Sequence, residues 1–145
     1  MRTGESNREK SANGLMFEQE VFDLLKKNNI LYITKQRYPI NIRRGSINVE
    51  PDITLSDPFT LISVKRSIRE RWKQDVPYQF IHGVKKIMLV TQEAKYPKAC
   101  HEFYDNVFVF PQDENKFVQM LKHGVVRNTL DFWWNKPSNS DGQSE

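Results

Sequence analysis

Residues 50–74, EPDITLSDPFTLISVKRSIRERWKQ, contain the pattern on which the fold prediction rests. Residues 47–55 alternate between apolar and polar side chains, which is the period of a β-strand. Residues 59–66 predict a second strand after a turn at an Asp-Pro pair. A hairpin of these two strands brings Asp52 and Lys65 side by side at one edge of a sheet.

Helical and strand periodicity continues on both sides of this hairpin. Asn13 is a predicted cap for the first helix, because an apolar stripe with i, i+4, i+7 and i+8 spacing begins at Phe17. Residues 39–46 are expected to form an irregular connection with Arg43-Arg44-Gly45 at its tip. The predicted helices are 15–27, 67–75, 97–104 and 113–122, the last one stopped by Gly124, and the other predicted strands are 30–36, 86–91 and 106–110. This order predicts an α/β sandwich with a central mixed sheet.

The length of 145 residues is typical of one domain, which we expect at residues 13–135 between disordered tails at 1–12 and 136–145. Cys100 is the only cysteine, which excludes an intramolecular disulfide and a Cys-rich zinc site. The sequence has no apolar run long enough for a bilayer and no apolar signal-peptide core. A cytoplasmic protein without a membrane partner is expected.

The formal net charge of +4 favours a polyanionic partner. Five of the nine residues from Lys65 to Lys73 are basic, and Lys35, Arg37, Arg43 and Arg44 form a second basic group. The alternative interpretation of both groups is a solvated charged face.

An acidic residue and a lysine at the ends of neighbouring strands suit metal-dependent phosphodiester hydrolysis. Carboxylates and backbone carbonyls are the oxygen ligands that Mg²⁺ prefers, and the bound metal makes water nucleophilic. A lysine nearby orients the water and stabilises the charge that develops on the phosphate. The sequence has no Gly-rich phosphate-binding loop, so no nucleotide cofactor is expected.

Pro51-Asp52 and Ser63-Val64-Lys65 resemble the two halves of the PD-(D/E)xK nuclease motif, with serine in place of the second acid. The chain is most similar to small type II restriction endonucleases with an SxK variant, in which an acid from the following helix replaces the missing carboxylate. Glu70 is the first candidate for that acid, and Asp75 is the second. The resemblance implies a restriction-endonuclease-like αβα sandwich and Mg²⁺ or Mn²⁺ as cofactor. It also implies a homodimer that cuts double-stranded DNA at specific sequences.

The same resemblance implies a role for each residue of the motif. Asp52 and the Val64 carbonyl would bind the metal, and Lys65 would act on the attacking water. Ser63 would at most hydrogen-bond a metal-bound water. Glu18, on the first helix, would approach the metal; its alternative role is a surface residue paired with a lysine. Glu70 has a similar alternative, an ordinary surface pair within its helix.

Basic residues around the motif are expected to contact DNA: Arg43, Arg44, Arg66, Arg69 and Lys73. The Arg43-Arg44-Gly45 loop and residues 78–83 are candidates for reading base edges. Three alternatives remain open at this point. The first is a Holliday-junction resolvase-like nuclease of the same fold. The second is a catalytically inactive DNA-binding module of that fold, and the third is a protein-interaction domain.

Overall fold

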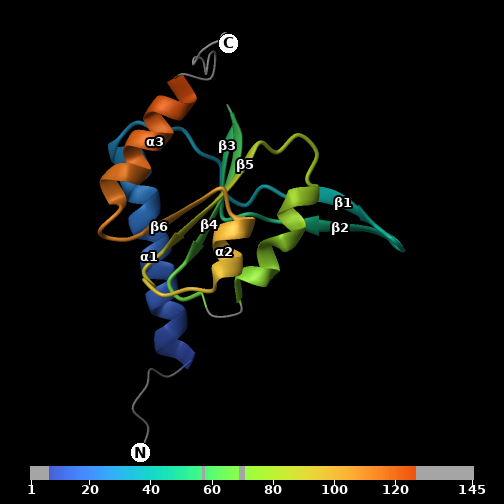
Figure 1. Cartoon of the computed structure of the whole chain (residues 1–145), viewed down its shortest axis with the longest axis horizontal. Coiled ribbons are helices and arrows are strands. Elements are labelled where there is room, and N and C mark those ends of the chain that lie inside the picture. The colour runs from blue at the N-terminus through green and yellow to red at the C-terminus, as the bar shows by residue number, and fades with distance from the viewer. Residues whose placement is uncertain (1–6, 57, 69–70, 127–145) are drawn as a thin grey trace, which may run out of the picture.

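The computed structural model of the chain describes residues 7–56, 58–68 and 71–126, with side chains described from residue 14 to residue 123 of these ranges. At its centre is a four-stranded sheet in the order β3-β4-β5-β6 (Figure 1). Strand β3 pairs antiparallel with β4, whereas β4 with β5 and β5 with β6 are parallel pairs. The strand bounds are Ile53–Ser56 for β3, Phe59–Lys65 for β4, Lys86–Thr91 for β5 and Asn106–Val109 for β6. The predicted α/β class with a mixed central sheet is confirmed.

A separate two-stranded hairpin, β1 (Tyr38–Ile42) and β2 (Gly45–Val49), extends away from the central sheet (Figure 1). The irregular connection predicted at residues 39–46 is wrong, because most of this segment belongs to the paired strands. The predicted tip is confirmed, because Arg43 and Arg44 form the two-residue turn between the strands. Gly45 follows the turn with a φ of 139°, a backbone conformation that favours glycine.

Helices cover both sides of the sheet (Figure 1). Helices α1 (Asn7–Lys27) and α3 (Glu114–Val126) lie on one side. On the other side lie α2 (Lys98–Phe103) and a 3₁₀-helix, η1 (Arg71–Phe80). Parallel strands need a crossover connection, and η1 and α2 lie on the two crossovers of this sheet.

Two apolar clusters hold these layers together. The first joins α1 and α3 to the sheet, and Phe17, Val21 and Leu25 of α1 are almost completely buried in it. Their i, i+4, i+8 spacing is the predicted stripe, which places one face of the helix on the sheet. The second cluster joins η1, α2 and the base of the hairpin to the opposite face, with Trp72 and Tyr104 among its buried members. The second cluster holds η1 against this face of the sheet.

Three helix predictions need correction. Helix α1 begins at Asn7, so Asn13 lies inside it and does not cap it. The helix predicted at 67–75 is instead η1, which continues through Pro77, because the fixed φ of proline is compatible with 3₁₀ geometry. Helix α3 passes Gly124 and ends at Val126, since glycine weakens a helix by only about 1 kcal/mol.

Two strand predictions also need correction. Residues 30–36 do not form a regular strand: they make one bridge, Ile33 to Thr54, and Lys35 has a φ of 60°, which interrupts extended backbone. The alternating stretch 47–55 is divided between β2 and β3. The break lies at Pro51-Asp52, where proline has no N–H to give to a ladder.

No helix among the described residues has the length and apolar character needed to cross a membrane.

Candidate active site

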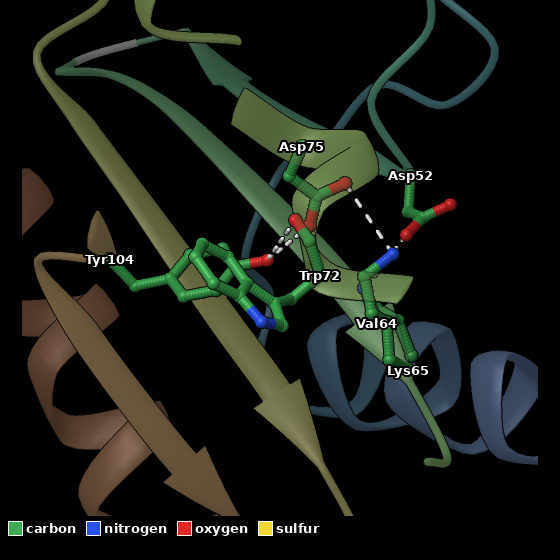
Figure 2. A network of polar contacts seen from close by, with 6 residues as sticks. All are labelled: Asp52, Val64, Lys65, Trp72, Asp75 and Tyr104. Atoms are coloured by element: carbon green, nitrogen blue, oxygen red, sulfur yellow. Dashed lines mark hydrogen bonds and ion pairs between the residues drawn. The ribbon is translucent and has the colours of Figure 1, made fainter. Parts of the chain in front are cut away.

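Asp52 lies directly before β3 and is hydrogen-bonded to the backbone of the neighbouring strand β4. Its Oδ2 accepts a hydrogen bond of 2.7 Å from the backbone N–H of Val64 near the end of β4 (Figure 2). The N–H and C=O of one strand residue face the same edge, so the Val64 carbonyl also faces the Asp52 side. The predicted neighbourhood of Asp52, Val64 and Lys65 is therefore present.

Lys65 is held by a second carboxylate, which comes from η1. Its Nζ lies 3.4 Å from Oδ1 of Asp75, and the two side chains are only 13% and 2% exposed. The other oxygen of Asp75 accepts a hydrogen bond from the Tyr104 hydroxyl (Figure 2). Asp75 is thus buried between a cation and a phenol, which compensates its charge.

Asp52, Lys65 and Asp75 line a cleft of about 360 Å³. The cleft lies between the β3–β4 junction, η1 and the base of the hairpin. The lining is mostly polar, which suits a charged ligand better than an apolar one. Arg71 and Gln74 bring an exposed cation and an amide to it from η1. The lining residues are Val49, Glu50, Asp52, Val64, Lys65, Arg71, Gln74, Asp75 and Tyr78.

Glu18 and Asp52 form a pair of acids at this site. Burial, the nearby Asp52 charge and a hydrogen bond to Asp52 together raise the pKa of Glu18. Burial likewise raises the pKa of Asp52, although the Val64 N–H and the Lys65 charge act in the opposite direction. Two carboxyls in contact repel when both are ionised, so the pair has an electrostatic preference for a cation beside it.

Two tyrosines complete the surroundings of Asp75. Burial and then the charge of Asp75 raise the pKa of Tyr78 and of Tyr104 far above the usual phenol value. Both hydroxyls therefore stay protonated at neutral pH. They remain hydrogen-bond donors for the Asp75 carboxylate.

Ser63 lies on the same face of β4 as Lys65 but is completely buried. Its Oγ has no hydrogen-bond partner among the described residues. It is not among the residues that line the cleft.

The remaining predicted site residues are dispersed. Arg43 and Arg44 are exposed at the hairpin tip. Arg66 lines a smaller hollow beside Met16 and Glu20, and Lys73 is exposed on η1 outside the cleft lining. Glu70 and Arg69 lie outside the described residues.

Sequence reasoning missed Arg71, Gln74 and Tyr104 and ranked Asp75 only second. The sequence does indicate that Arg71, Gln74 and Asp75 lie together. Positions 71, 74, 75 and 78 are spaced three to four residues apart, which places them on one helical face. Tyr104 had no such signal, because it reaches Asp75 from a different element, just after α2.

The oxygen donors fit a hard divalent cation. Among the described residues, no three His, Cys, Asp or Glu side chains are grouped as a metal site. Mg²⁺ commonly uses only one or two carboxylates and keeps water and substrate phosphate as its other ligands. Asp52, Glu18 and the Val64 carbonyl satisfy that requirement.

Comparisons of the chain with models of known protein families, with curated proteins and with solved structures found no match.

Proposed function

We propose that this protein is a Mg²⁺-dependent DNA endonuclease of the PD-(D/E)xK type that hydrolyses phosphodiester bonds in double-stranded DNA. One observation carries the proposal: the Asp52 carboxylate is fixed on the backbone of Val64, directly beside Lys65, in a polar cleft. The mild excess of positive charge is consistent with a polyanionic substrate.

Asp52, Glu18 and the Val64 carbonyl would hold the metal ion in this proposal. Bound Mg²⁺ would neutralise phosphate charge and lower the pKa of a water ligand. The Val64 N–H keeps one oxygen of Asp52 in place. The other oxygen of Asp52 takes no part in that bond and would serve as a ligand once the metal ion displaces the proton shared with Glu18.

Lys65 would act on the reacting phosphate. Its ammonium group is restrained by Asp75, so little side-chain freedom is lost when the substrate binds. A fixed positive charge in a poorly solvated cleft stabilises the charge that grows on the phosphate in the transition state. Arg71, on the same cleft wall, would hold an adjacent phosphate.

Duplex DNA has two strands to cut, and one such site cuts one strand. We therefore propose a homodimer that acts on a site with two-fold symmetry. The protein would act in the cytoplasm, and Mn²⁺ would replace Mg²⁺, since both prefer oxygen ligands.

The test is incubation of wild type, Asp52→Asn and Lys65→Met with plasmid and phage DNA, with Mg²⁺ and with EDTA. Lys116→Met is the matched control, because Lys116 is an exposed lysine on α3. We expect cleavage by wild type and the control in Mg²⁺, and none in EDTA or by the two site variants. Cleavage by Asp52→Asn at the wild-type rate would refute the assignment, as would no cleavage by wild type with either metal.

A second candidate is a DNA-binding module of the same fold without catalytic activity. The buried Ser63, which has no carboxylate to offer a metal, favours it. In that case Asp52→Asn and wild type would bind duplex DNA equally, and neither would cut linear duplexes or four-way junctions. Cleavage of four-way junctions alone would instead identify a resolvase-like enzyme.

A further inference from the structure

The β1–β2 hairpin projects from the rim of the candidate active site. Among the strands that the structure describes, β1 and β2 pair only with each other, and the hairpin extends beyond the layered body (Figure 1). Val49, the last residue of β2, and Glu50, which follows it, line the cleft. Any polymer lying across the cleft therefore passes the base of this hairpin.

The two faces of the hairpin differ in chemistry. The register pairs Tyr38 with Val49 and Ile40 with Ile47, and alternation places all four on one apolar face. The base of this face packs into the core, where Ile40 is 4% exposed. The contact with the core fixes the orientation of the hairpin and turns its opposite face outward.

The outward face carries hydrogen-bonding side chains. Asn41 pairs with Ser46 and Pro39 with Asn48 in the register, and all four residues are exposed. Asn and Ser offer donors and acceptors without charge, which is the chemistry that reads base edges. Ser46 and Asn48 are about 6.6 Å apart along the strand, which is roughly two base-pair steps.

The tip adds positive charge. Arg43 and Arg44 are both exposed, and the segment from Tyr38 to Val49, YPINIRRGSINV, contains no acidic residue. The charge of the hairpin is thus complementary to a phosphate backbone. Its width also matches a nucleic acid, because the major groove of B-DNA admits a two-stranded β-ribbon.

We propose that this hairpin enters the major groove of duplex DNA, with Asn41, Ser46 and Asn48 against base edges and Arg43 and Arg44 on phosphates. The inference rests on the proposed function and deepens it, since it assigns sequence recognition to a surface distinct from the cleft. Asn pairs bidentately with adenine, so the preferred sequence is expected to contain adenine at the positions that the two asparagines face.

The test is selection of bound DNA from a random duplex pool in EDTA, followed by affinity measurements at several salt concentrations. Wild type is expected to enrich a short motif. Asn41→Ala/Asn48→Ala should lose that motif, with binding to it at least about thirtyfold weaker because two base contacts are removed, and keep its affinity for unselected duplex. Arg43→Ala/Arg44→Ala should weaken binding to every duplex and make the slope of log K against log salt shallower by about 1.8.

Lys116→Ala/Lys122→Ala is the matched control, because it removes two exposed positive charges from α3, on the opposite side of the sheet (Figure 1). It should leave the motif and the salt slope unchanged. The inference is refuted if wild type enriches no motif, if the asparagine variant enriches the wild-type motif, or if single strands or RNA bind better than duplex.

Failure of the proposed nuclease function can be distinguished from failure of the hairpin inference. A hairpin that reads duplex DNA without hydrolysis would enrich a motif while Mg²⁺ produced no cleavage of it. Conversely, a nuclease that recognises DNA elsewhere would cut in Mg²⁺ while the hairpin variants retained the wild-type motif.

Discussion

Replacing Lys65 by methionine tests the ion pair between Lys65 and Asp75 in the proposed site. The substitution keeps most of the side-chain volume but removes the charge that faces Asp75 at 3.4 Å. Asp75 then remains buried with tyrosine hydroxyls as its neighbours and no cation. We expect a clear loss of stability, because a buried charge has lost its partner.

The size of the effect follows from the geometry. At an effective dielectric constant of about 20, two unit charges 3.4 Å apart attract by about 5 kcal/mol. Desolvation of both groups offsets much of this energy, and removing one partner of a buried pair typically costs about 3–5 kcal/mol. Because Lys65 is still 13% exposed, we expect a value near the lower end, about 3 kcal/mol.

A double-mutant cycle isolates the pair. The free energy of unfolding in urea is measured for wild type, Lys65→Met, Asp75→Asn and the double variant. Asparagine still accepts a hydrogen bond from Tyr104 but has no charge. The double variant should therefore be more stable than the sum of the single effects predicts, by about 1–3 kcal/mol.

Lys116→Met controls for the loss of an exposed lysine and should change stability by less than about 0.5 kcal/mol. A coupling energy below about 0.5 kcal/mol between Lys65 and Asp75 would refute the argument. The lysine would then be held by groups other than Asp75.

Three further predictions concern single residues in or next to the site. Ser63→Ala removes a buried hydroxyl without a partner and should raise the free energy of unfolding in urea by about 1 kcal/mol; a loss of stability would contradict this. Arg71→Ala should slow DNA cleavage at least about tenfold with an unchanged melting temperature, because Arg71 is exposed in the cleft; Lys116→Ala is its control, and an unchanged rate would exclude Arg71 from the site. The third prediction concerns stability in EDTA, because the pKa values of Asp52 and Glu18 are raised in the folded protein above their ordinary values of 3.8 and 4.5. As pH rises from these ordinary values through the raised ones, the carboxyls ionise more readily in the unfolded chain, so the folded protein loses stability. Asp52→Asn should therefore flatten the decline in melting temperature with pH, and an unaltered decline would show that this carboxyl is not responsible.

The sequence was sufficient to predict the strands that carry the site. Strand β5 coincides with the predicted residues 86–91, and β4 differs from its prediction only by ending at Lys65. These segments are buried, and their apolar patterns determine register without information from elsewhere in the chain. Asp52 and Lys65 could be placed together for the same reason, since both belong to one antiparallel hairpin.

The surroundings of Lys65 could not be predicted in the same way. Asp75 reaches Lys65 because η1 forms through Pro77, and Tyr104 reaches Asp75 because α2 packs against η1 in the second apolar cluster. Such contacts depend on how the two crossover elements, η1 and α2, pack beside each other on one face of the sheet. Local periodicity carries no information about that arrangement.

Asp52 and Asp75 show how environment separates two carboxylates in one cleft. Asp52 is paired with another acid, and burial raises its pKa, which makes it the carboxyl that a metal ion would occupy in the proposed function. Asp75 already has a cation and a tyrosine hydroxyl, so it restrains Lys65. Ser63 and Lys65 share the face of β4 that η1 covers, so the carboxylate beside Lys65 comes from η1 and not from β4. In the proposed nuclease, the negative charge beside Lys65 would therefore come from the layer above the strand and not from the strand itself, which would account for the serine at position 63.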